Sequence, residues 1–412
     1  MEQHAATWPK EGNARVPYRV FADSDVYRAE TSRIFLGATW QYLGLAAELQ
    51  AVGDYRTTFL GETPVIVTRG EDGEIHGMLN RCAHRGNLVC LKQHGHSDDG
   101  LTCVYHAWRY DLAGNLTSVA FRRGVGGKGG MPEGFQLEAH GLKKLRIGEF
   151  AGLVFGTLSP DAPPLSDYIG NMIGARIGRV MRGKPKILGT TSQILHNNWK
   201  LYIENVKDTY HASLLHSFFT TFQITRLTTA GGVAIGESGG NHASYTRGGE
   251  AGNKAGSDKL YSDIHTLRED YRLQDPRFLD AVDEIGDGIT LQILSVFPNF
   301  VLQQIHNSLA LRLVLPKGPH ETELQWTYIG FEEDDAAMTE RRLQQANLVG
   351  PAGYVSMEDG AVGGFIQRAI AGVEDECSVI EMGGIEHASQ ETRATEASVR
   401  GFWQAYRQTM GL

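Results

Sequence analysis

The chain has 412 residues, of which 41% are hydrophobic, and its formal net charge is −9 at pH 7. That length is too great for one small module, and it predicts two domains or three, each with an ordinary hydrophobic core. The negative charge argues against broad nucleic-acid binding, which needs basic surface, and an anionic substrate would need local positive charge at its site.

The N-terminal segment, Met1 to Tyr18, has no apolar stretch of the signal-peptide type, and no run approaches the ~18 apolar residues of a membrane span. The four cysteines, Cys82, Cys90, Cys103 and Cys377, do not suggest a disulfide framework. We therefore expect a cytoplasmic protein that binds neither membrane nor nucleic acid.

The first part of the chain, from about residue 34 to 158, is predicted to be all-β, because short strand-like runs alternate with glycine-rich turns. The candidate strands are Thr57–Leu60, Pro64–Thr68, Ile75–Leu79, Leu101–Tyr105 and Leu153–Gly156. Asp72-Gly73 is a hairpin signal between the second and third of these. The glycine-rich segment Arg122–Gly134 predicts a surface loop.

The second part, from about Pro160, mixes strand and helix patterns. Polar, glycine-rich Gly231–Gly256 predicts a mobile loop, with a lid over an active site as the minor alternative. Leu302–Leu315 alternates as a single strand, and Asp335–Leu348 permits a helix. Ala397–Met410 predicts a helix with Val399, Phe402, Trp403 and Tyr406 on one side.

Two cysteine–histidine pairs stand close together, Cys82-Ala83-His84 and Cys103-Val104-Tyr105-His106. Two thiolates and two imidazoles suit a [2Fe–2S] cluster in which sulfur holds one iron and nitrogen the other, an arrangement that raises the reduction potential. The alternative is a Cys2His2 zinc site. Zinc fingers, however, usually pair cysteine with cysteine along the chain, and these pairs are mixed.

A second group of candidate ligands follows Trp199. Asp208, His211 and His216 offer the two imidazoles and the carboxylate of a non-haem Fe(II) site with open coordination positions. A spacing of five places the two histidines about 140° apart on a regular helix, so we expect the helix to be distorted or to end between them. The alternative is that these side chains only cap and solvate a helix.

Both motifs resemble those of one family. Arg81-Cys82-Ala83-His84-Arg85-Gly86 with Cys103-Val104-Tyr105-His106-Ala107-Trp108 resembles the Rieske signature, Cys-x-His-Arg-Gly followed by Cys-x-x-His-x-Trp. Glu204-Asn205-x-x-Asp208-x-Tyr210-His211-x4-His216 resembles the mononuclear-iron motif of the Rieske non-haem iron ring-hydroxylating oxygenases. The resemblance spans nearly the whole chain and is closest to large subunits that act on benzoic-acid-type substrates.

The resemblance implies an α+β fold in two domains. An all-β Rieske domain would occupy residues 35–160. A mixed α/β catalytic domain, built on an antiparallel sheet with helices that hold a mononuclear iron, would combine residues 1–34 and 161–412.

The resemblance also assigns the site residues. It implies that Cys82, His84, Cys103 and His106 bind the [2Fe–2S] cluster, and that His211, His216 and Asp359 bind Fe2+, with Glu358 the neighbour that is open to misassignment. Asp208 would bridge His106 of one chain and His211 of the next, so the working unit would be a ring of subunits. Asn205 would support the iron site, or equally be an ordinary polar group on the helix.

In the Leu302–Leu315 run Arg312 shares a polar face with Gln304, His306 and Ser308, which the pattern alone allows to be either a pocket lining or an ordinary solvent-facing stripe, and Arg393 alone reads as an ordinary charge in a loop. By resemblance both contact a substrate carboxylate. The implied activity is addition of both atoms of O2 to an aromatic carboxylate, terephthalate above others, to give a cis-dihydrodiol. Alternatives are dioxygenation of another benzoate-type acid such as isophthalate, monohydroxylation of a salicylate- or anthranilate-like acid, and a stand-alone Rieske electron carrier.

The expected partners follow from the same resemblance. The chain lacks a Gly-x-Gly-x-x-Gly fingerprint in a strand–turn–helix setting, so a separate NAD(P)H-dependent reductase is expected to deliver electrons. A small β subunit in an α3β3 hexamer is expected as well, although some relatives are trimers of large subunits alone.

Overall fold

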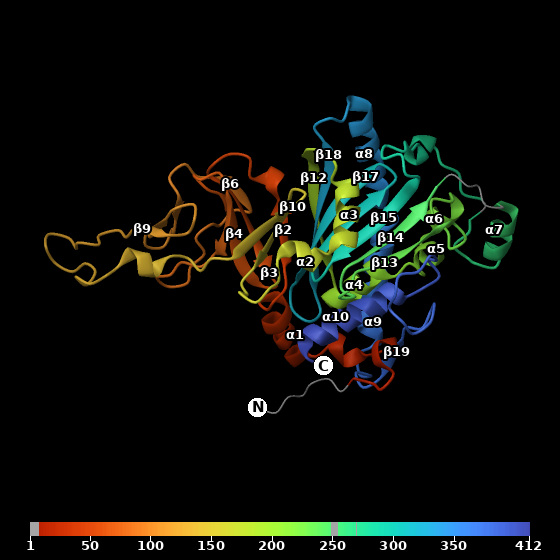
Figure 1. Ribbon diagram of the computed structural model, residues 1–412, viewed down its shortest axis with the longest axis horizontal. Helices are drawn as coiled ribbons and strands as arrows, with labels where there is room; N and C mark the ends of the chain where they lie inside the picture. Colours follow the sequence, from red (N-terminus) through yellow and green to blue (C-terminus); the bar gives the residue numbers. More distant parts are fainter. Residues whose placement is uncertain (1–7, 249–253, 269) are drawn as a thin grey trace. The chain divides into compact units, whose positions relative to one another are not determined.

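The computed structural model describes residues 8–248, 254–268 and 270–412 of the chain (Figure 1). The chain forms two compact units, which we call the all-β unit and the mixed unit. The all-β unit is Phe35–Leu165, and the mixed unit combines Met1–Ile34 with Ser166–Leu412. No helix in the described ranges is both long and apolar enough to cross a membrane.

The all-β unit consists of ten strands in three antiparallel sheets, with orders β5-β4-β3-β6, β10-β11-β2 and β7-β8-β9. Its strands are β2 (Gln41–Leu45), β3 (Asp54–Leu60), β4 (Thr63–Arg69), β5 (Ile75–Leu79), β6 (His94–His96), β7 (Leu101–Thr102), β8 (Arg109–Tyr110), β9 (Leu116–Ser118), β10 (Arg146–Phe150) and β11 (Leu153–Thr157). The predicted hairpin at Asp72-Gly73 is confirmed, since β4 and β5 pair antiparallel across it.

One predicted strand of this unit is shorter than expected. Leu101–Tyr105 was expected to be extended throughout, but the strand ends at Thr102. Cys103 begins a turn instead, in which its carbonyl accepts a hydrogen bond from the amide of Ala107. Hydrophobic alternation continues past the point at which the backbone turns, so the pattern did not mark the boundary.

The mixed unit is built on a seven-stranded antiparallel sheet of order β12-β18-β17-β16-β15-β14-β13. These strands are β12 (Pro185–Leu195), β13 (Gly231–Ile235), β14 (His242–Arg247), β15 (Ile289–Val296), β16 (Phe300–Ile305), β17 (Ser308–Pro316) and β18 (Thr322–Phe331), and β1 (Arg15–Pro17) pairs with β19 (Cys377–Val379) apart from them. The helices of the chain are α1 (Ser24–Glu30), α2 (Leu165–Ile169), α3 (Asn171–Val180), α4 (Trp199–Lys207), α5 (Ala212–Leu215), α6 (Ser217–Thr221), α7 (Lys254–Tyr261), α8 (Ala336–Val349), α9 (Ser356–Ala369) and α10 (Ala397–Met410).

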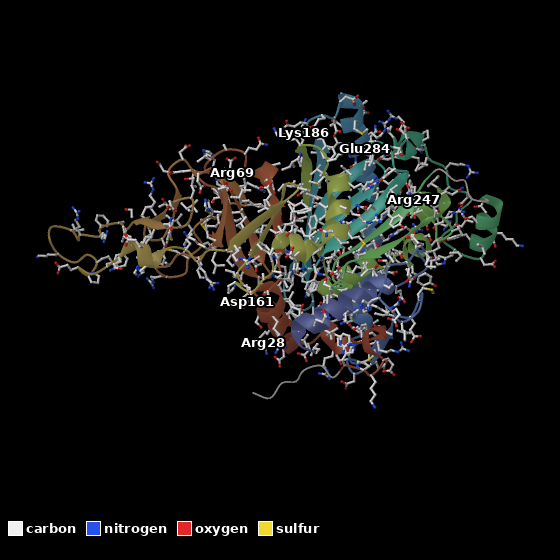
Figure 2. All side chains as sticks on the ribbon, in the orientation of Figure 1. Arg28, Arg69, Asp161, Lys186, Arg247 and Glu284 are labelled. Carbon is white, nitrogen blue, oxygen red and sulfur yellow. The ribbon has the colours of Figure 1, made fainter. Side chains whose placement is uncertain are left out.

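Helices cover both faces of this sheet. On one face lies α4, whose Lys207 donates to Ser295 of β15. On the other face lies α3, whose Arg176 donates to Gln292 and whose Arg179 donates to Gln304. Gln292 is three residues from Ser295 on β15, so the two side chains project from opposite faces of the sheet. We call the side that α4 covers the inner face. Charged side chains such as Arg28 and Lys186 are exposed at the surface of the unit (Figure 2).

The segment before Phe35 belongs to the mixed unit because a buried carboxylate fastens it there. Glu30 accepts hydrogen bonds from the indole of Trp199 and the hydroxyl of Tyr406, and it pairs with Lys200 at 2.6 Å. Tyr406 lies on α10, whose predicted range and apolar side are both confirmed. A buried ion pair is stable only when its remaining polar atoms are satisfied, and these neighbours satisfy those of Glu30.

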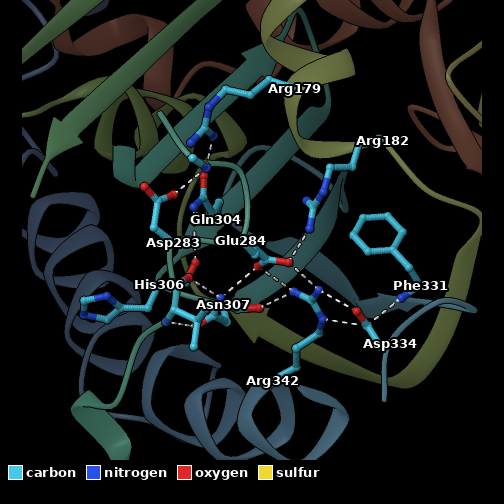
Figure 3. Close-up of polar contacts among 12 residues, drawn as sticks. Arg179, Arg182, Asp283, Glu284, Gln304, His306, Asn307, Phe331, Asp334 and Arg342 are labelled. Atoms are coloured by element: carbon cyan, nitrogen blue, oxygen red, sulfur yellow. Dashed lines mark hydrogen bonds and ion pairs between the residues drawn. The ribbon is translucent and has the colours of Figure 1, made fainter. Parts of the chain in front are cut away.

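Leu302–Leu315 is a hairpin of two strands, which corrects the prediction of one strand. The chain turns at His306-Asn307, where His306 has a φ of 52°. Arg342 holds this turn, since it donates to the carbonyl of Asn307 and pairs with Glu284 and Asp334 (Figure 3). The turn lacks glycine and both strands are buried, so apolar alternation runs through it without a signal.

The hairpin changes which residues share a face with Arg312. In the antiparallel register Arg312 lies opposite Val301, and Ala310 lies opposite Gln303. Opposite residues project from the same face of a sheet. Arg312 therefore shares the inner face with Gln303 and Ile305, and not with Gln304 and His306 as predicted.

The predicted mobile loop Gly231–Gly256 is also corrected. Two stretches of it form strands β13 and β14, which pair over the register Gly231↔Thr246 to Ile235↔His242, and its end enters α7. Residues 249–253 of the prediction lie outside the described residues. The glycines that suggested flexibility permit close packing, because a Cβ on Gly232 would collide with the carbonyl of Gln390.

Candidate functional site

The two cysteine–histidine pairs lie on two loops with the same backbone hydrogen bonds. In the first, Cys82 accepts from the amide of Gly86 and donates to the carbonyl of Asn87; in the second, Cys103 accepts from Ala107 and donates to Trp108. The residue four positions after each cysteine has positive φ, 76° at Gly86 and 51° at Ala107. Each loop therefore curls back on its cysteine and presents the histidine between.

These loops bring the four predicted cluster ligands together. Cys82 and Cys103 are 3% and 2% exposed at the edge of the core, whereas His84 is exposed and the centroids of the His84 and His106 rings lie 4.5 Å apart. The hydroxyl of Tyr110 lies 3.2 Å from Cys82 Sγ, and Asn87 Nδ2 lies 3.7 Å from Cys103 Sγ. Two sulfurs inside and two ring nitrogens at the surface fit a cluster with two chemically different irons.

The second group of ligands forms where α4 ends. Asn198 caps the start of α4, and the helix stops at Lys207 because Asp208 adopts an extended conformation. A new turn starts at His211, whose carbonyl accepts from the amide of Leu215, and His216 ends it. No regular helix carries both histidines, as expected, but α4 ends at Lys207, before His211 and not between the two, and a single helical turn, α5, lies between them.

Three ligand atoms converge at this break. Asp359 Oδ1, from the first turn of α9, lies 3.4 Å from His211 Nε2 and 3.2 Å from His216 Nε2. The three donor atoms lie within 4.8 Å of one another, so they fit the two-histidine, one-carboxylate set of an Fe2+ site. Asn205 Nδ2 donates to the same Asp359 oxygen at 3.1 Å, which places Asn205 beside the ligands.

The outer nitrogens of both histidines face carboxylates. His211 Nδ1 lies 3.2 Å from Asp208 Oδ2, and His216 Nδ1 lies 2.7 Å from Glu358 Oε2. Burial lowers the pKa of both histidines, but the carboxylates around them outweigh it and raise the pKa of each above its ordinary value. A carboxylate on the outer nitrogen orients a ligating imidazole and increases its basicity.

Glycines let α9 carry Asp359 close to β12. A Cβ on Gly360 would lie 2.9 Å from Gln193 Nε2, and one on Gly363 would overlap the amide of Asn197. One face of α9 therefore carries no side chains where it packs against the end of β12. This close packing sets the position of Asp359 in the first turn.

A cavity opens beside the three ligands. Its floor is the inner face of the sheet, with Ser244, Ile293, Gln303 and Ile305 among the lining residues. Arg312 and Arg393 both line it, Arg312 from β17 and Arg393 from the loop before α10.

Both arginines are buried without a carboxylate partner in the described part of the chain. Arg312 is 6% exposed, donates to the Tyr202 hydroxyl at 2.8 Å and stacks on the Trp326 ring at 4.2 Å. Arg393 is 4% exposed and donates to neutral oxygens of Thr225, Thr246 and Arg226. Burial lowers the pKa of Arg393 to about 10, which still leaves it charged at neutral pH.

Asp208 lies beside a second concavity, on the other side of His211. Glu204, Glu396 and Asp208 line it together with apolar Val362, Ile366 and Val379. Burial raises the pKa of Glu204 to about 8, with the neighbouring carboxylates acting in the same direction. This concavity gives the Asp208 carboxylate a path to the surface of the mixed unit.

The sequence missed several residues of the site. Glu358 was treated only as a possible misassignment of the ligand, yet it contacts His216. Gln303 was not singled out, because a single continuous strand would put it on the face opposite Arg312. Thr209 was not singled out, although its hydroxyl donates to the carbonyl of Arg393 at 2.7 Å and ties that loop to the ligand segment.

Comparison with protein families assigns both units. A Rieske [2Fe–2S] domain matches residues 39–125, and the catalytic domain of the ring-hydroxylating alpha subunits matches residues 186–412. The first match excludes the zinc reading of the cysteine–histidine pairs, and the second excludes a stand-alone electron carrier.

Relatives match over nearly the full length. The chain is 52% identical to terephthalate 1,2-dioxygenase, terminal oxygenase component subunit alpha 2, of Comamonas sp, covering 100% of this chain and 99% of the relative. It is 44% identical to the anthranilate 1,2-dioxygenase large subunit of Burkholderia cepacia, covering 98% and 95%. The structure of naphthalene 1,2-dioxygenase from Rhodococcus sp. bound to indole covers 96% of this chain and 94% of its own, with a TM-score of 0.79 and 23% identity, a likeness that establishes the fold.

Proposed function

Since this chain belongs to the ring-hydroxylating oxygenase alpha subunits that carry a Rieske [2Fe–2S] domain, we propose that it is the large subunit of a dioxygenase acting on an aromatic dicarboxylate, namely terephthalate. The reaction adds both atoms of O2 to the ring. Two electrons and two protons complete the cis-dihydrodiol, and the electrons come from NAD(P)H through a separate reductase.

One observation carries this choice of substrate: two buried arginines without carboxylate partners line one cavity beside the iron-ligand set. A guanidinium that is out of water and unpaired is costly, so two of them call for an anionic occupant. An aromatic diacid offers one carboxylate to Arg312 and one to Arg393, and its flat ring fits the apolar side chains between them. The name of the terephthalate relative agrees with this choice.

We assign the metal ligands as the resemblance implies. Cys82, His84, Cys103 and His106 hold the [2Fe–2S] cluster, and His211, His216 and Asp359 hold Fe2+. When bound, the cluster supplies single electrons at a raised potential, and the iron supplies open coordination positions for dioxygen. The chain itself orients the ligands through Asp208 and Glu358, and it holds the ring of the substrate beside them.

We assign Asp208 the role of bridge between His106 of one chain and His211 of the next. The cluster histidines lie at the surface of the all-β unit, and Asp208 lines a surface concavity of the mixed unit, so each end is open to a partner. This requires a ring of subunits. We further propose that a small β subunit completes an α3β3 hexamer, and that the assembly is cytoplasmic.

Product analysis tests the proposed substrate. The purified oxygenase and a reductase are supplied with terephthalate, isophthalate, anthranilate or salicylate under 18O2. Terephthalate should turn over fastest, with two labelled atoms per product. One labelled atom would show monohydroxylation, the alternative supported by a salicylate 5-hydroxylase relative that is 39% identical over 98% of this chain.

Substitution of the anchors tests the observation itself. Arg312→Gln and Arg393→Gln should each retain iron, because neither contacts a ligand, and each should cost on the order of 2–5 kcal/mol in kcat/KM for terephthalate. Unchanged kcat/KM in an iron-loaded Arg312→Gln enzyme would refute the assignment of that anchor.

A further inference from the structure

The cavity contains one buried amide whose hydrogen bonds are unmet. Gln303 of β16 is 1% exposed and lines the cavity, and neither its Nε2 nor its Oε1 has a hydrogen-bond partner. Among the described residues it is the one side chain with two such atoms. Buried polar groups in folded proteins are almost always satisfied, so a donor and acceptor pair held empty in a cavity points to a ligand.

The sheet register places this amide next to one arginine and away from the other. Gln303 lies opposite Ala310 on β17, and Arg312 is two residues further on, so the two are diagonal neighbours about 7–8 Å apart at Cα. Both project from the inner face. Arg393, in contrast, is held by Thr246 of β14, a strand separated from β16 by β15.

Arg312 is itself fixed by its neighbours. Its Nη1 donates to Tyr202, its plane stacks on Trp326, and its Nε has no partner. A carboxylate that meets the unused donors of Arg312 has a second oxygen free, and the Gln303 amide is the adjacent side chain that can donate to it. At the Arg393 end the neighbouring side-chain groups are the hydroxyls of Thr225 and Thr246, which accept from the arginine and lie 3.1 Å from each other, so that end has hydroxyls where the Arg312 end has an amide.

We propose that Gln303 is a substrate-binding residue that donates a hydrogen bond to the carboxylate held by Arg312. This inference rests on the proposed function and deepens it, because it makes the two ends of the cavity chemically different. Because the amide of Gln303 also accepts, that end should take a carboxamide in place of a carboxylate, and the Arg393 end should not. Loss of the charge that faces Arg312 should make 4-carbamoylbenzoate bind more weakly than terephthalate, and Gln303→Leu should weaken its binding further.

Binding without turnover tests the proposal. The dissociation constant for terephthalate is measured by calorimetry under anaerobic conditions, on the iron-loaded oxygenase and its variants. Gln303→Leu should weaken terephthalate binding about 10- to 100-fold, as expected for loss of a hydrogen bond to a charged group. Gln303→Glu, which keeps the size and adds a negative charge, should weaken it further. Gln304→Leu, the neighbouring amide on the opposite face, is the matched control and should bind terephthalate like the wild type.

A double-mutant cycle identifies the partner of Gln303. If both side chains hold one carboxylate, Gln303→Leu should have less than about a twofold effect in an Arg312→Gln background and its full effect in an Arg393→Gln background. An equal effect in both backgrounds would overturn the pairing with Arg312. Should Gln303→Leu not fold, Gln303→Met replaces it in the cycle.

Different binding results would overturn the role of Gln303 and the proposed function. Tight terephthalate binding by folded Gln303→Leu, with binding weakened in both arginine variants, would overturn the role of Gln303 alone. Wild-type binding in both arginine variants would refute the dicarboxylate anchors, whatever Gln303 does.

Discussion

Each proposed iron ligand has a second side chain in contact with it, a carboxylate beside each histidine and an amide beside the aspartate. Asp208 stands behind His211, and Glu358 stands behind His216. Asp359 has the amide of Asn205 on its ligating oxygen. Each ligand is thus held by a second side chain, and the rings keep their orientation without help from the ion.

Glu358 should therefore determine how tightly the site holds iron. Glu358→Ala removes the acceptor from His216 Nδ1, and loss of such an outer partner typically weakens metal affinity 10- to 100-fold. Glu358→Gln retains an oxygen that accepts the same hydrogen bond, so it should retain most of the affinity. Iron affinity is measured by competition with a chelator. Equal affinity in wild type and Glu358→Ala would mean that the contact does not support the ligand.

Glu204 should make stability fall as pH rises. Burial raises its pKa from 4.5 to about 8, and the hydrogen bond from Trp403 Nε1 only partly opposes this shift. The folded state thus binds an extra proton between pH 4.5 and 8, so stability present below that window is lost as pH rises through it. Above pH 8 the cost is on the order of 5 kcal/mol.

Glu204→Gln isolates this effect, because glutamine can still accept from Trp403 but does not ionise. Unfolding by urea at pH 5.5 and pH 8.5 should show the variant gaining stability relative to wild type at the higher pH. Parallel pH dependence in the two proteins would contradict the raised pKa.

At the scale of elements, the position of Asp359 depends on how closely α9 meets the end of β12. Gly363→Ala introduces a Cβ against the buried amide of Asn197, so the helix must shift. We expect a loss of about 1–3 kcal/mol in the free energy of unfolding, and a lower iron content, since Asp359 lies on the preceding turn.

Gly364→Ala is the matched control for that helix. Its Cβ would meet only the carbonyl of His196, at 3.9 Å, and alanine favours a helix by up to about 1 kcal/mol over glycine. This variant should be as stable as wild type or slightly more so, with full iron content. If both variants lose iron equally, close approach at Gly363 is not what positions Asp359.

Local chemistry made some elements predictable and left others hidden. The histidine spacing correctly indicated that no regular helix carries both ligands, because residues five apart do not share a face, but it did not locate the end of α4 at Lys207. The hairpin tip at His306-Asn307 was missed because apolar alternation runs through it without a glycine, and what holds the turn is a tertiary contact, the guanidinium of Arg342. Gln303 was lost with it, since one missed turn reverses the face of every residue before it.

Glycine misled the prediction of β13 and β14 for a related reason. In Gly231–Gly256 it was taken to indicate mobility, yet Gly231 and Gly232 lie in a strand where larger residues would collide with neighbouring backbone. Sequence alone does not distinguish a glycine needed for backbone flexibility from one needed for close packing against a neighbouring backbone. The roles of Arg312 and Arg393 likewise came from family resemblance, because the side chains around them come from six separate elements and loops.

At the scale of the whole molecule, the two sets of metal ligands belong to different compact units. The cluster ligands come entirely from Phe35–Leu165, and the iron ligands entirely from Ser166–Leu412. Each unit brings its ligands together without a residue of the other. Electron transfer therefore depends on how units meet, and Asp208 is the residue of the mixed unit that we propose meets a cluster histidine.

Oligomers assembled from two defective variants test whether electrons pass from the cluster of one chain to the iron of another. One chain type carries Cys82→Ser and Cys103→Ser, so it has no cluster; the other carries His216→Ala, so it has no mononuclear iron. Neither type alone can turn over terephthalate. Co-expressed with different affinity tags and purified through both, they should recover about a third of the wild-type rate per chain, because each mixed ring of three chains has one junction in three that joins an intact cluster to an intact iron of the next chain. Introducing Asp208→Asn into the cluster-free chain should abolish the recovered activity, whereas the same change in the iron-free chain should leave it. If mixed oligomers with the expected iron and cluster content are inactive, electrons pass within one chain and Asp208 is not an intersubunit bridge.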